Sequence, residues 1–193
     1  MPPIDTQSSL RTHPDLADIF VACESRHLNE EEFETYLSVV PEFQSRANAA
    51  KEMKAKDGAV VRQTIKELYE IYPYEKFHQI AMPKCIRDVR YVTAYATQSM
   101  LMGDPDWFRD KLLIWLKTIL QSFQYPDIPK GTTRRLNQEP EALQMVESLK
   151  PEQRSVYECY YKVKKDLHKE LSSDAYAEME AYLQISIDIL SND

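Results

Sequence analysis

The residues best suited to chemistry lie in one short stretch, residues 83–91, which reads PKCIRDVRY. A thiol, two cations and a carboxylate fall within five positions there, at Lys84, Cys85, Arg87 and Asp88. Neighbouring cations and a helix N-terminus lower the pKa of a cysteine and favour the reactive thiolate. The stretch is therefore a candidate for covalent attachment of a ligand at Cys85.

The other charged side chains of this stretch indicate what kind of ligand would fit. Asp88 follows Cys85 by three residues, so the two side chains lie on nearby faces of a helix. A carboxylate can accept two N–H hydrogen bonds, and Lys84 and Arg87 can pair with carboxylates of the same ligand. The implied ligand is joined by a thioether, has N–H donors near its middle and carries anionic arms. A linear tetrapyrrole meets each of these requirements.

The same residues also have a purely structural interpretation. Cys85, Val89, Val92 and Ala96 recur at the spacing of one buried helix face. A free cysteine in such a position is most often a small apolar core residue. Lys84 and Asp88 would then form an ordinary i,i+4 pair on the helix surface.

Composition excludes several classes of protein. The net charge of -7 argues against general binding to the nucleic-acid backbone. With three glycines the chain lacks both GxGxxG and P-loop patterns, and no GxSxG or nucleophile–base set is present, so we expect no enzyme. The three cysteines are too far apart for a zinc motif or a disulfide framework. No apolar run is long enough to span a bilayer, and the N-terminus lacks a signal-peptide core.

Apolar residues spaced three and four apart predict an all-α chain of seven to nine helices. The expected helices cover residues 16–24, 28–40, 41–56, 59–72, 83–103, 107–123, 141–149, 151–171 and 175–190. Asn29 is expected to cap its helix in a capping box with Glu32. Asp57-Gly58 is expected to break one helix from the next.

Further signals bound the helix that carries Cys85. Pro83 suits a first helical turn, because its missing N–H has no partner to lose there. Gly103 is expected to end this helix, and Asp104 to cap the next one with Pro105 at its first position.

The sequence KCIRDVRY, followed by VTAYATQSMLMGD, resembles the chromophore helix of phycobiliproteins, the light-harvesting subunits of the phycobilisome. The family pattern is a cysteine, one residue, Arg-Asp and a tyrosine-containing helix that ends in Gly-Asp. The distance from Asp88 to Gly103-Asp104 fits this pattern without a gap. The stretch RHLNEEEFETYLSVVPEFQSRANAAKEMKAKDGAVV is similar to the first globin helices of the family, and SSDAYAEMEAYLQISIDILS to its last helix.

This resemblance implies a globin-like phycobiliprotein fold in a single domain over residues 1–193. Residues 1–25 would form an N-terminal arm and helical extension, and about 130–171 an extra helical insertion before the last helix. Phycobiliproteins carry bilins, so the implied cofactor is a covalent linear tetrapyrrole of the phycocyanobilin type. The site residues implied are Cys85 for the thioether, Asp88 for the pyrrole N–H groups, Lys84 and Arg87 for the propionates, and Tyr91 for packing.

The resemblance also implies a cellular setting. The partners would be other phycobiliprotein-like subunits, linker proteins or photosystem proteins, with no nucleic acid and no integral membrane segment. The location would be cytoplasmic, at the cytoplasmic or stromal face of the thylakoid membrane, and the role light harvesting or energy transfer.

Departures from the family pattern favour an alternative role. The loop before Cys85 is shorter, Ala94 stands where the family usually has arginine, and the insertion is additional. A chromophore-free interaction protein of the same fold, acting in phycobilisome or photosystem assembly, docking or turnover, is the second interpretation. A globin-type haem sensor is a third, for which His168 is the histidine placed within a helix.

Overall fold

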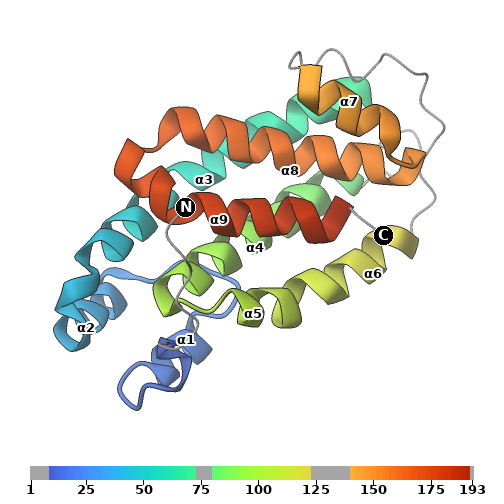
Figure 1. Ribbon diagram of the computed structural model, residues 1–193. Helices are drawn as coiled ribbons and strands as arrows, with labels where there is room; N and C mark the ends of the chain where they lie inside the picture. The colour runs from blue at the N-terminus through green and yellow to red at the C-terminus, as the bar shows by residue number, and fades with distance from the viewer. Residues whose placement is uncertain (1–8, 73–79, 123–139, 192–193) are drawn as a thin grey trace.

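The computed structural model describes residues 9–72, 80–122 and 140–191, and within these ranges the regular elements are all helical (Figure 1). The elements are η2 (Leu10–Thr12), α1 (Ala17–Ala22), α2 (Glu30–Val39), η3 (Pro41–Phe43), α3 (Gln44–Ile71), α4 (Ala81–Met102), α5 (Pro105–Phe108), η5 (Arg109–Leu113), α6 (Ile114–Ser122), α7 (Pro140–Ser148), α8 (Pro151–Glu170) and α9 (Ser173–Ser191). The predicted all-α, globin-like class is confirmed.

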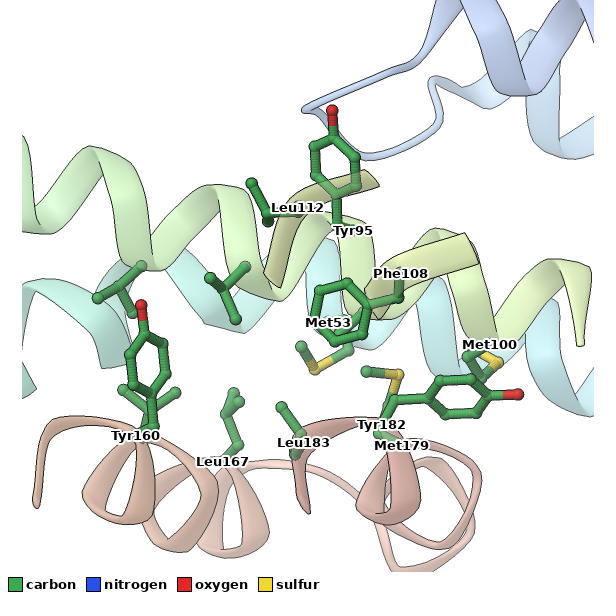
Figure 2. Close-up of a cluster of buried hydrophobic side chains, with 14 of the residues drawn as sticks. Met53, Tyr95, Met100, Phe108, Leu112, Tyr160, Leu167, Met179, Tyr182 and Leu183 are labelled. Atoms are coloured by element: carbon green, nitrogen blue, oxygen red, sulfur yellow. The ribbon is translucent and has the colours of Figure 1, made fainter. Parts of the chain in front are cut away.

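The centre of the molecule is built from α3, α4, α8 and α9, which pack against one another. In Figure 1, α8 and α9 lie side by side in front of α3 and α4, while α5, η5 and α6 continue along α4 and α9. Figure 2 shows side chains of these helices converging on a common core, among them Met53 of α3, Leu167 of α8 and Leu183 of α9. Fixing α4 between α3 and α9 fixes the helix that carries the candidate residues.

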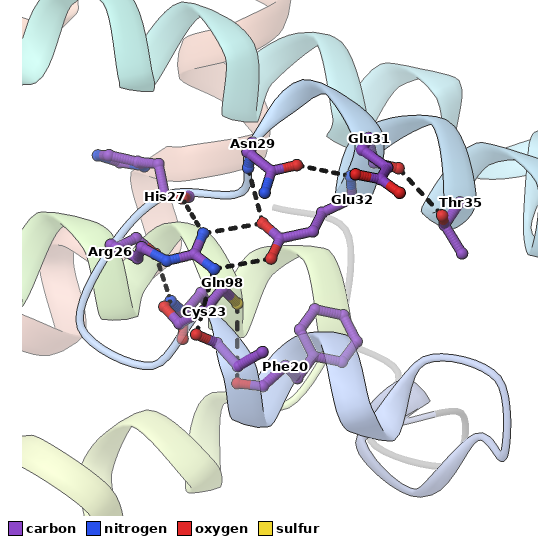
Figure 3. A network of polar contacts seen from close by, with 10 residues as sticks. Phe20, Cys23, Arg26, His27, Asn29, Glu31, Glu32, Thr35 and Gln98 are labelled. Carbon is purple, nitrogen blue, oxygen red and sulfur yellow. Dashed lines mark hydrogen bonds and ion pairs between the residues drawn. The ribbon is translucent and has the colours of Figure 1, made fainter.

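Several residues predicted to cap helices make the expected contacts. The Asn29 side chain accepts a hydrogen bond from Glu32 N at 2.9 Å, and Glu32 Oε2 accepts one from Asn29 N at 2.7 Å. This completes the capping box of α2 (Figure 3). Gly103 ends α4 with φ of 66°, a conformation that favours glycine. Asp104 caps α5 by accepting from Trp107 N at 2.9 Å, with Pro105 at the first position.

The predicted break at Asp57-Gly58 is wrong, because α3 continues through both residues. Asp57 is 1% exposed, and its Oδ2 accepts a hydrogen bond from Thr93 Oγ1 at 3.0 Å. His27 Nε2 lies 2.9 Å from the same oxygen. These tertiary contacts engage one oxygen of a carboxylate that would otherwise disfavour a helix interior. The helix therefore persists because of packing partners that the local sequence does not reveal.

The N-terminal segment is tied to the far end of α4. The Gln98 side chain of α4 donates to the backbone oxygens of Cys23 and Arg26 (Figure 3). Tyr95 Oη donates to Glu24 Oε1 at 2.9 Å. Ser9 Oγ donates to Asp104 Oδ2 at 2.9 Å. From Ser9 onward, the N-terminal segment is held against α4 and Asp104, and its status as an extension of the family domain stays a prediction. Residues 1–8 lie outside the described part.

The segment predicted as an insertion supplies two helices, α7 and α8. Side chains of α8, including Val156, Tyr160, Val163 and Leu167, are buried in the common core. α8 packs along α3 and α9 instead of projecting from the domain. The described part of residues 130–171 is therefore integral to the core of this chain, and its status as an addition relative to the family stays a prediction.

The Asp57 contacts lead to a prediction about stability. Asp57→Ala leaves the buried His27 Nε2 without its partner and removes one of the two acceptors of the Thr93 hydroxyl, the other being Arg90 O, which should lower the free energy of unfolding by about 2–4 kcal/mol. Urea unfolding followed by far-UV circular dichroism measures this change. Asp110→Ala, at a site 59% exposed, is the matched control and should cost no more than about 0.5 kcal/mol. A loss below about 1 kcal/mol for Asp57→Ala would contradict this role.

Candidate functional site

α4 divides into two halves with different surroundings. Every residue from Val92 to Met102 is buried, whereas the half before it has an open outer face. Lys84, Arg87 and Tyr91 are exposed on that outer face, and Cys85 and Asp88 are half-buried at its edge. The structure thus brings the five predicted residues together on about two turns of one helix, and separates the thiol from the cations.

The Cys85 thiol points into the protein and lies 3.3 Å from Tyr69 Oη, within hydrogen-bond distance. Burial raises the pKa of this thiol; the Tyr69 contact lowers it, and the negative charge of Asp88 raises it. The predicted lowering of the Cys85 pKa is therefore wrong in this conformation. The prediction fails because Cys85 is the fifth residue of α4 and lies past the first turn, where the helix N-terminus has less effect on a thiol pKa. The neighbouring cations also point outward, away from the thiol.

Asp88 is held by its neighbour Arg87. Arg87 Nε donates to Asp88 Oδ1 at 2.8 Å, and Arg87 NH2 lies 2.6 Å from the same oxygen. Hydrogen bonding and attraction to Asp88 raise the pKa of Arg87. The predicted i,i+4 pair between Lys84 and Asp88 is not formed, because Asp88 pairs with Arg87 and Lys84 extends into solvent.

Tyr91 occupies the outer face one turn beyond Arg87. Its side chain is 37% exposed, and Arg87 Cζ lies 5.9 Å from the centre of its ring. A guanidinium at this distance from an aromatic ring is weakly attracted to it. Tyr91 and Arg87 are thus neighbours on the exposed face of α4.

A small cavity of about 70 Å³ opens next to the candidate residues, between α3, α4, α6 and α8. Its lining is Ile65, Leu68, Cys85, Asp88, Val89, Leu120, Ser155, Val156, Cys159 and Tyr160. The lining is mainly apolar, and Asp88 is the charged side chain at its edge. Cys159 is a buried thiol on the same cavity as Cys85, a placement that the sequence did not predict.

Glu158 is a second feature that sequence reasoning missed. This glutamate of α8 is fully buried near the Tyr72 hydroxyl, at the C-terminal end of α3. Burial raises the pKa of its carboxyl to about 7, and a hydrogen bond from Tyr72 lowers it only in part. The signal in the sequence was available, since Glu158 lies among aromatic residues in VYECYY.

The histidines do not contribute to this site within the described residues. The His168 ring stacks on Tyr176 with 4.1 Å between ring centres, at the exposed end of α8 and away from the cavity lining. This position does not suit a proximal haem ligand. His78 lies outside the described residues.

The comparison with protein families now identifies the class of protein. The model of the phycobilisome protein family matches residues 22–130, which include α2 to α6 and the five candidate residues of α4, but not the α8 side of the cavity. The chain belongs to the phycobilisome protein family. A search of curated proteins found no match.

Membership in this family implies a phycobiliprotein-like role. Phycobiliproteins are light-harvesting proteins rather than enzymes, they generally carry covalently bound bilins, and they assemble into phycobilisomes. Phycobilisomes lie on the cytoplasmic face of thylakoids. Within the described residues, no helix combines the length and apolar character needed to cross a membrane. The match ends at residue 130, where the predicted insertion begins.

The buried Glu158 carboxyl leads to a prediction about pH. Its pKa of about 7 exceeds the ordinary 4.5, so between these values the folded chain binds more protons than the unfolded chain. This group therefore makes stability fall as pH rises through that interval. Glu158→Gln removes the titration, and its unfolding free energy relative to wild type should increase by about 3 kcal/mol from about pH 5 to about pH 8.

Chemical unfolding at both pH values measures this difference. Glu34→Gln, at an exposed position of α2, is the control for the same substitution at the surface. If the unfolding free energies of wild type and Glu158→Gln change equally between the two pH values, the buried carboxyl does not titrate in this range.

Proposed function

We propose that this protein is a bilin-binding subunit of a light-harvesting complex, with the pigment joined to Cys85 through a thioether. The observation that supports this proposal most strongly is the joint placement of Cys85 and Asp88 on the lining of one apolar cavity. Both residues lie within the segment that the family model matches. A sulfur and a hydrogen-bond acceptor are thus adjacent on a mainly apolar lining.

The chemistry of the donor set fits a bilin. The Cys85 sulfur would form the covalent bond, and the Asp88 carboxylate would accept hydrogen bonds from pyrrole N–H groups. Arg87 and Lys84 would pair with the propionates, and the exposed ring of Tyr91 would cover part of the pigment. When bound, the pigment supplies visible-light absorption, and a rigid site keeps its excited state from decaying by torsional motion.

The size of the cavity limits how the pigment can be held. About 70 Å³ is well below the roughly 300–1,000 Å³ of typical ligand pockets. Most of a tetrapyrrole must therefore lie outside this cavity. The Arg87–Asp88 pair must also reorganise if Asp88 is to accept from pyrrole nitrogens. Bilin binding therefore requires a surface outside the cavity to hold most of the pigment, and requires the Arg87–Asp88 pair to separate.

The Arg87–Asp88 pair and the raised pKa of Cys85 favour a second candidate function. A closed Arg87–Asp88 pair and a thiol with a raised pKa are compatible with a stable pigment-free protein. Such a protein would act by binding partners during phycobilisome or photosystem assembly, docking or turnover. The predicted addition at residues 130–171, with α8 in the core, would then alter the shape of the family fold instead of adding a separate arm.

The setting proposed for either function is the cytoplasmic or stromal face of the thylakoid membrane. The proposed partners are other phycobiliprotein-like subunits, linker proteins or photosystem proteins. The proposed pigment is a bilin of the phycocyanobilin type.

Covalent attachment gives the first test of the bilin-binding function. Co-expression with bilin synthesis and a range of bilin lyases should give a protein band with zinc-enhanced fluorescence on a denaturing gel. Cys85→Ala should abolish this band because it removes the sulfur. Cys23→Ala, at a buried thiol near the N-terminus, is the matched control and should keep it. Absence of a band from folded wild-type protein would favour the pigment-free function.

The role of Asp88 gives a second test. Asp88→Asn keeps the size of the side chain and removes its charge, so the thioether should still form. The native absorption band should shift and the fluorescence yield should fall, while the spectrum of the denatured protein should stay the same. Asp110→Asn, at an exposed position of η5, is the control. Identical native spectra for wild type and Asp88→Asn would exclude contact between this carboxylate and the pigment.

A further inference from the structure

One face of the molecule carries acidic and basic residues in separate clusters that lie over the same side of α3. Glu30 of α2 lies 3.0 Å from Lys54 Nζ and 3.8 Å from Lys51 Nζ, which places the start of α2 over this side. Gly58 and Arg62 follow Lys54 at four-residue steps, so they continue the same side of the helix. The clusters are therefore neighbours along one helix.

The basic cluster consists of Arg62, Lys66 and Arg90. A Cβ placed on Gly58 would lie 3.5 Å from Arg62 NH1 and 3.8 Å from Arg90 Cζ, so these two guanidinium groups lie close together across α3 and α4. Lys66 follows Arg62 by one turn, and all three side chains are exposed. Arg90 Nε lies 3.9 Å from the buried Asp57 carboxylate, while Arg62 and Lys66 have no ion pair among the described residues.

The acidic cluster consists of Glu30, Glu31 and Glu34 at the start of α2. All three are exposed, and Glu30 is the one that pairs with lysines of α3. Between the two clusters α3 presents the small exposed residues Ala55 and Ala59, while the guanidinium groups of Arg62 and Arg90 lie over Gly58. Small residues let another helix approach closely, and the flanking charges of opposite sign would then meet their complements.

From this arrangement we infer that a second copy of this chain binds the face, in a symmetric dimer. In a two-fold contact the same patch is used by both partners, so residue i meets residue j and residue j meets residue i. The Arg62–Lys66–Arg90 cluster of each copy faces the Glu30–Glu31–Glu34 cluster of the other.

Two acidic residues lie near the basic cluster, Glu70 on α3 and Asp88 on α4, and Asp88 is already paired with Arg87. A chain with a net charge of -7 repels its own copies at long range, so local complementarity must supply the attraction.

The inference does not depend on the bilin-binding function, because it uses residues outside the proposed pigment site and is measured without pigment. Sedimentation analysis should give a mass that rises from 22.6 kDa toward twice that value with concentration in about 0.05 M salt. The dissociation constant should increase at least about tenfold in about 0.5 M salt, because screening weakens contacts between exposed charges.

Charge reversal identifies the face. Arg62→Glu with Lys66→Glu makes both clusters acidic, and Glu31→Lys with Glu34→Lys makes both basic, so each double variant alone should be monomeric. A one-to-one mixture of the two should form a heterodimer at least about tenfold tighter than either variant with itself. Lys111→Glu, at an exposed position of η5, is the control and should dimerise as wild type does.

Circular dichroism of each variant establishes that it is folded. The inference is overturned if the folded wild type stays at 22.6 kDa at all concentrations in low salt. It is also overturned if a dimer forms that Arg62→Glu with Lys66→Glu does not weaken, or if the mixed variants do not pair. Binding of poly-L-glutamate by a strictly monomeric wild type would instead assign the basic cluster to an acidic partner, and would equally overturn the dimer.

Discussion

Burial of α4 on every side over its C-terminal half is the constraint on which the candidate site depends. Four polar side chains lie within this buried stretch, and each has a partner: Thr93 donates to Asp57, Thr97 to Thr93 O, Gln98 to the N-terminal segment and Ser99 to Asp104 O. Unpaired polar groups in such a position would cost stability, so these contacts permit α4 to be enclosed. Enclosure fixes the axis and rotation of the helix. The orientation of Cys85 and Asp88, about one to two turns before this stretch, follows from it.

The N-terminal half of α4 is partly exposed, and this exposure determines how its thiol and charged side chains can react. The thiol is turned toward the protein, where burial raises its pKa, while the charged side chains remain in water. Cys85 is therefore protected in this conformation, and covalent attachment requires the thiol to be uncovered and deprotonated. Since Tyr69, Asp88 and the side chains of α8 surround it, small movements of these groups control access to the sulfur.

Local signals in the sequence were sufficient for several helix ends. The Asn29 capping box, the Gly103 C-cap and the Asp104 N-cap depend on residues close in the chain, so they could be predicted. The continuity of α3 could not, because one oxygen of Asp57 is engaged by His27 and Thr93, which are 30 and 36 residues away. The same limit explains the Cys85 pKa: adjacent cations suggested a lowered value, but the packing around the thiol raises it. Cys159 and Glu158 likewise acquire their significance only when α8 packs on α3.

Peptide mapping by mass spectrometry of the protein purified from the cells that produce it tests the central claim most directly. The account predicts that the peptide containing Cys85 carries the added mass of one bilin, and that the peptides containing Cys23 and Cys159 are unmodified. An unmodified Cys85 peptide from protein isolated with its native partners would contradict the account and would establish the pigment-free function in its place.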